Sequence, residues 1–122
     1  MTTICSMLRS RLALANGDGK QALAFAEQAL ASVRDEHSED PIGDRYRVAL
    51  TYLLLGDVQK SGGDGEAATA AWNAGLGQLP RGAAEWPLQM SEHAELLQRL
   101  GRSAEAAPIV ERLNRMGYRS II

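Results

Sequence analysis

The sequence predicts an all-α protein, and three observations support that prediction. Apolar residues recur at helical spacing along several segments, and short turns rich in Gly and Asp separate these segments. Alanine is abundant while aromatic residues make up only 5% of the chain, which suits close contact between helices. Val, Ile and Thr, which strands favour, are sparse. We expect about six antiparallel helices in one domain that covers residues 1–122.

The first two helices are expected on either side of a turn at residues 16–19. A threonine near the N-terminus can cap a first helix that runs to about Ala15. The turn glycines can adopt the left-handed conformation that ends a helix, and Asp18 is placed to cap the helix from Lys20 to Arg34. The inward faces are predicted to be Ile4, Met7, Leu8, Leu12 and Ala15 in the first helix, and Ala22, Leu23, Ala26, Ala29, Leu30 and Val33 in the second.

An acidic segment that contains proline and glycine, Asp35–Gly43, predicts a break before the third helix. Asp44 is a suitable N-cap, so we expect this helix to begin there and to run to about Lys60. Its apolar stripe consists of Tyr46, Ala49, Leu50, Leu53, Leu54 and Val58.

Three further helices complete the chain. They are expected at Glu66–Leu79, Pro87–Leu100 and Ala104–Met116, with Asp64 capping the first of them and Ser103 the last. The inward residues of the fifth helix are predicted to be Leu88, His93, Ala94, Leu97 and Leu100, and Gly117 is the predicted left-handed C-cap of the sixth.

The segment Ala49–Gly82 resembles one tetratricopeptide (TPR) unit, a helix–turn–helix of about 34 residues. The TPR pattern of a small residue, alanine, an aromatic residue, a small residue and proline is matched by Gly56, Ala68, Trp72, Gly75 and Pro80. The resemblance implies a single TPR-like domain in which three helix pairs stack as an alpha-alpha superhelix. These pairs are about 2–34, 44–80 and 87–117.

The second helix of each predicted pair also repeats within the chain. The segments GDGKQALAFAEQAL, GDGEAATAAWNAGL and GRSAEAAPIVERLN begin at Gly17, Gly63 and Gly101 and align without gaps. The first helices repeat less clearly, so an irregular six-helix bundle stays open as an alternative. The aligned columns are Ala22, Ala68 and Ala106, then Ala26, Trp72 and Val110, then Ala29, Gly75 and Leu113.

Composition gives little support for catalysis, nucleic-acid binding or membrane insertion. The net charge is −2, without the basic patch that nucleic acid requires. A lone Cys5 excludes an intramolecular disulfide and a cysteine-based zinc site, and with two histidines on other elements it forms no recognisable catalytic set. We therefore expect a non-enzyme without cofactor or metal, and no nucleic-acid or membrane partner. Arg9 and Arg11 interrupt the first apolar segment, which argues against a signal peptide and favours the cytoplasm.

One acid-rich loop and two glycine-rich turns are candidate ligand sites. His37 lies among four acidic residues and one serine at positions 35–40. Their spacing matches neither an EF-hand loop nor a zinc-binding pair, so we expect a solvated loop. The turns at 16–20 and 62–65 lack the spacing of a phosphate-binding loop and follow no strand, so they are expected to be turns between helices.

The TPR resemblance implies a groove lined by the first helix of each pair, in which a peptide or a partner protein binds. We expect a scaffold for protein–protein interaction, in a bacterial signalling or regulatory system on the basis of composition. The alternative is a self-association domain, a homodimer formed through exposed Leu or Met side chains with Ile121 and Ile122. The groove residues that the resemblance implies are Met7, Arg11, Leu50, Leu53, Asp57, Lys60, Ser91, Glu95, Gln98 and Arg99.

Trp72→Ala is expected to lower the free energy of unfolding by about 3 to 5 kcal/mol, because the indole is predicted to fill the junction between helix pairs. Thermal or denaturant melts of the variant and the parent chain check this value. A variant that melts with the parent chain would place Trp72 outside the core.

Overall fold

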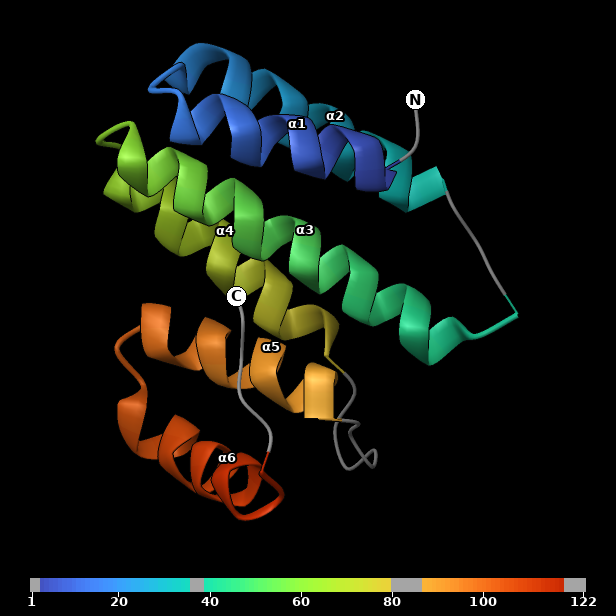
Figure 1. The fold of residues 1–122 in the computed structure, drawn as a ribbon, viewed down its shortest axis with the longest axis vertical. Helices are drawn as coiled ribbons and strands as arrows, with labels where there is room; N and C mark the ends of the chain where they lie inside the picture. Colours follow the sequence, from blue (N-terminus) through green and yellow to red (C-terminus); the bar gives the residue numbers. More distant parts are fainter. Residues whose placement is uncertain (1–2, 36–38, 80–86, 118–122) are drawn as a thin grey trace.

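The computed structural model describes residues 3–35, 39–79 and 87–117, and within these ranges it contains six α-helices and no strand (Figure 1). This confirms the predicted all-α fold. The helices are α1 (Thr3–Ala15), α2 (Gly19–Asp35), α3 (Pro41–Ser61), α4 (Gly65–Gln78), α5 (Pro87–Arg99) and α6 (Ser103–Arg115).

Consecutive helices form three hairpins, α1–α2, α3–α4 and α5–α6, which follow one another along the molecule with α3 and α4 in the middle (Figure 1). Each hairpin turn contains a glycine with positive φ, namely Gly17, Gly63 and Gly101. The predicted caps Asp18 and Asp64 are confirmed, since each side chain accepts a backbone N–H from the first turn of the next helix at 3.1 Å. The three pairs thus share one turn geometry.

Two predicted helix starts are wrong. The third helix begins at Pro41 rather than at Asp44, because Asp40 caps it by accepting the N–H of Gly43 at 3.0 Å and proline fits the first helical position. Ser103 is the first residue of α6 and not its cap, and the N-cap position is occupied by Arg102 without a side-chain hydrogen bond. Gly117 has φ 73°, which confirms its left-handed conformation.

The predicted inward face of α1 is wrong for three of its residues. Leu8 and Leu12 are 61% and 62% exposed, and Ala15 is exposed as well. The side of α1 that packs on α2 carries small residues instead, and Ser10 donates a hydrogen bond of 2.6 Å to the carbonyl of Ala22. Small side chains allow this close approach, whereas two leucines there would hold the helices apart. The buried residues of α1 are Ser6, Met7, Ser10 and Ala13; the side chain of Ile4 lies outside the described part.

Helix α3 is the centre of the packing, because it contacts α1, α2, α4 and α5. One side of α3 faces the first hairpin, where Ala22, Ala26 and Ala29 are fully buried as predicted. On the side that faces α4 and α5, Trp72 is 7% exposed and belongs to a buried cluster with Leu53 and Leu96, and this confirms its place at a junction of hairpins. The sequence pattern missed Leu96, which is fully buried.

Glycine residues allow α3 and α4 to lie close together. A Cβ atom on residue 56 would lie 2.3 Å from Nε1 of Trp72, so the indole occupies the space that Gly56 leaves empty. A Cβ atom on residue 75 would lie 3.0 Å from Cβ of Tyr52 and 3.3 Å from Cδ2 of Leu96. Two of the residues on which the TPR resemblance depends are therefore required by packing.

The fifth and sixth helices bury Ala94, Leu97 and Ala106 between them, the first two as predicted. His93 is half-buried rather than fully inward. Met90 is buried without having been predicted. The side chain of Leu88 is outside the described part, as are Pro80 and His37.

Gly56→Ala is expected to lower the free energy of unfolding by about 1 to 3 kcal/mol, because the new methyl group overlaps the buried indole. The matched control is Gly77→Ala, in an exposed part of α4 where a Cβ meets nothing within 4 Å. That variant is expected to be more stable by about 0.5 to 1 kcal/mol. Urea unfolding of both variants measures the difference, and equal effects would contradict the close contact of Gly56 with Trp72.

Candidate functional site

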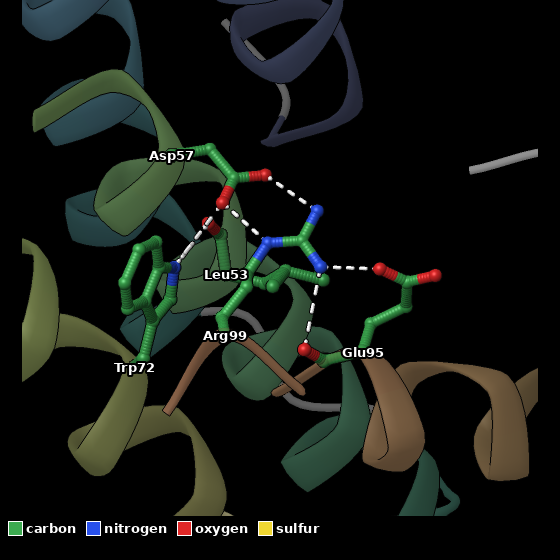
Figure 2. Close-up of polar contacts among 5 residues, drawn as sticks. All are labelled: Leu53, Asp57, Trp72, Glu95 and Arg99. Carbon is green, nitrogen blue, oxygen red and sulfur yellow. Dashed lines mark hydrogen bonds and ion pairs between the residues drawn. The ribbon is translucent and has the colours of Figure 1, made fainter. Parts of the chain in front are cut away.

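A group of polar contacts joins α3 and α5 where the two helices meet (Figure 2). The Arg99 guanidinium donates from Nε to Oδ1 of Asp57 at 2.6 Å and from its second terminal nitrogen to Oδ2 of Asp57 at 3.0 Å. This is the bidentate geometry that guanidinium and carboxylate groups favour. The remaining nitrogen donates to the carboxylate of Glu95 and, at 3.3 Å, to the backbone carbonyl of the same residue.

The same carboxylate reaches the indole of Trp72. Nε1 of Trp72 donates to Oδ1 of Asp57 at 3.2 Å and to the carbonyl of Leu53 at 3.3 Å. Asp57 therefore connects α3 to both α4 and α5 (Figure 2). We call Asp57, Trp72, Glu95 and Arg99 the Arg99 cluster. It stands at the edge of the core, because the side chains of Arg99, Asp57 and Glu95 are 24%, 32% and 21% exposed.

Burial acts to lower the pKa of Arg99, but hydrogen bonds and charge attraction from Asp57 and Glu95 outweigh it and raise that pKa above its usual value. The guanidinium is therefore charged at neutral pH. A permanent cation between two carboxylates can hold helices together and present oxygen atoms to a partner.

The ten residues that the TPR resemblance implies for a groove differ widely in accessibility. Three are exposed and can contact a partner directly, namely Arg11, Lys60 and Gln98. Leu50, Asp57, Glu95 and Arg99 are half-buried, and Met7, Leu53 and Ser91 are buried. The buried three contribute to packing in this structure, while the binding role of the set stays a prediction.

The first helices of the three hairpins are neighbours. Met7 of α1 lies against α3, where the hydroxyl of Thr51 is 3.9 Å from its sulfur atom. On the other side of α3, Asp57 binds Arg99 of α5. The first helices of the hairpins therefore lie side by side in the order α1, α3, α5. We call this arrangement of the three helices the row.

Two other candidates are the acidic segment around His37 and the lone Cys5. No group of three or more His, Cys, Asp and Glu side chains that could hold a metal occurs in residues 3–35, 39–79 and 87–117. His37 lies outside these ranges, and Cys5 is exposed on α1. In the same part of the chain, no helix is long and apolar enough to cross a membrane.

Sequence reasoning selected Asp57, Glu95 and Arg99 separately, each as a groove position, and missed that they contact one another. The Glu95–Arg99 pair has the favourable i,i+4 spacing and order, so a search for helical ion pairs would have found it. The ion pair between Asp57 and Arg99 depends on how the hairpins pack, and no sequence pattern near either residue indicates it.

A comparison of this chain with known protein families, with curated proteins and with solved structures found no match to any of them.

Arg99→Ala is expected to lower the free energy of unfolding by about 1 to 2 kcal/mol, because it leaves two half-buried carboxylates without their cation. Arg102→Ala is the matched control, since Arg102 pairs with Glu105 at an exposed position, and a change below about 0.5 kcal/mol is expected there. Urea melts of both variants test this. Equal losses would show that the Arg99 cluster contributes no more than a surface ion pair.

Proposed function

We propose that this chain is a non-catalytic, TPR-like scaffold that binds a peptide or a partner protein across the row formed by α1, α3 and α5. The observation that supports this most is the order of packing, in which α3 contacts α1 on one side and α5 on the other. Repeated helix hairpins that stack in this way present an extended surface made of corresponding helices. We further propose, on composition and the lone cysteine, that it acts in a bacterial signalling or regulatory system in the cytoplasm.

The accessible residues of this row suit a partner of mixed polarity. Arg11 and Lys60 supply positive charge at two separate helices, and Glu95 supplies a partly accessible carboxylate. Leu50, half-buried in the middle of α3, offers apolar surface. An extended or helical peptide with acidic groups and at least one apolar side chain would complement this arrangement.

A peptide selection tests the proposal. A random-peptide phage library is selected against the parent chain, and the enriched peptides are titrated against two double variants. Arg11→Glu/Lys60→Glu reverses two charges within the row, and binding is expected to weaken by about tenfold or more. Lys20→Glu/Arg112→Glu makes the same charge change at exposed positions of α2 and α6 and should leave affinity unchanged.

Two results would contradict the proposal that a peptide binds across the row. Peptides that bind both double variants equally well would place the binding surface elsewhere on the molecule. A library that yields no enriched sequence would argue against peptide binding altogether. Circular dichroism of each variant ensures that a loss of binding is not a loss of fold.

A second candidate function is self-association, and one observation favours it. Leu8 and Leu12 lie one helical turn apart on the outer side of α1 and are both largely exposed. Two copies could bury these side chains against each other, although Arg9 and Arg11 on the same helix would then face like charges. Light scattering over a range of concentrations, with Leu8→Gln/Leu12→Gln for comparison, distinguishes the two: a monomer at every concentration excludes self-association.

A further inference from the structure

A pocket of about 470 Å³ opens beside the N-terminal half of α3, on a different side of this helix from the row. On the helical wheel of α3, its lining residues Val48 and Tyr52 lie opposite Leu50 and Asp57. The volume is within the range of small-molecule sites. The C-terminal part of α2 contributes Val33 and Arg34, α3 contributes Arg45, Val48 and Tyr52, and the end of α4 contributes Gln78.

Arg34 is held in this pocket by a neutral group. Its guanidinium donates to the hydroxyl of Tyr52, and its central carbon lies 5.8 Å from the centre of the same ring. Both contacts orient the cation without cancelling its charge. Arg45 lines the same pocket, and neither arginine forms an ion pair within residues 3–35, 39–79 and 87–117.

Two acids near the arginines, Asp44 and Asp40, have partners of their own. Asp44 lines the pocket too, but its carboxylate pairs with Arg47 one turn further along α3. Asp40 accepts the N–H of Gly43 as the cap of α3. Among the described residues, the pocket therefore brings two guanidinium groups without an ion pair next to the apolar side chains of Val33 and Val48.

We infer that this pocket binds a carboxylate that carries an apolar group. A guanidinium matches the two oxygens of a carboxylate with parallel hydrogen bonds, and Arg34 is held in position before the ligand arrives. Val33, Val48 and the Tyr52 ring accept the apolar part, and the Gln78 amide offers a further hydrogen bond. A free phosphate fits less well, because it would leave the apolar lining in contact with water. The carboxylate can belong to a small organic acid or to the C-terminus of a peptide.

Calorimetric titration of the full chain with matched probes tests the inference. Octanoate and an acetylated tripeptide that ends in leucine represent the two sources, and the amide of each is its uncharged control. At least one acid is expected to bind saturably, and its amide about tenfold or more weaker. The acid that binds more tightly identifies the source. Acids and amides of equal affinity, no binding in the millimolar range, or equally tight binding of inorganic phosphate would each overturn the inference.

Variants locate the binding to the pocket. Arg34→Gln is expected to weaken the preferred acid by about tenfold or more, while Arg112→Gln, an exposed change on α6, leaves it unchanged. Tyr52→Phe keeps the ring but removes the acceptor that orients Arg34, so a smaller loss is expected. Parent-like affinity of a folded Arg34→Gln variant would contradict the site.

This inference does not depend on the proposed row. The Arg11→Glu/Lys60→Glu variant should bind the acid as the parent chain does, and Arg34→Gln should keep any peptide selected for the row. Loss of acid binding in the first variant would show that the two surfaces are not separate and would contradict the pocket as described.

Discussion

The contact between Gly56 and Trp72 is the constraint on which the rest of the packing depends. Because residue 56 has no side chain, the indole lies directly against α3, and α4 can follow α3 closely along its length. The ring then fills the cluster that Leu53 and Leu96 complete, so that α5 has a surface on which to pack. The absence of a side chain at residue 56 therefore sets how closely α4 packs on α3 and shapes the surface on which α5 packs.

The two junctions between hairpins use different chemistry. The first hairpin meets the second mainly through apolar residues, with the alanines of α2 against Leu54, Leu55 and Val58 of α3, and at its edge through the hydrogen bond from Arg34 to the neutral Tyr52 hydroxyl. The second meets the third through Leu96 and, at the surface, through the Arg99 cluster. A bidentate ion pair demands a particular orientation, whereas alanine and leucine tolerate small shifts. The Arg99 cluster thus determines the rotation of α5 about its axis relative to α3. The alanines determine the distance between α2 and α3.

The sequence was sufficient for the helices, the hairpin turns and most of the buried alanines, because helical periodicity and turn chemistry are local properties. The sequence-based predictions were wrong where a contact between distant parts of the chain determines which side chains are buried. Leu8 and Leu12 look like core residues by spacing, yet the serine face of α1 packs closer to α2. For the same reason, Arg34 and Tyr52 could not be associated in advance, since they lie on different helices.

The unequal junctions have a consequence for how the molecule opens. In a linear stack, each unit is stabilised only by its neighbours, so cooperativity is no stronger than the weakest junction. The third hairpin is at one end of the stack, its own core is small, and its attachment is partly polar. We therefore expect it to detach as a separate folding unit while the first two hairpins stay intact, with amide protons in α5 and α6 exchanging with solvent through this partial opening.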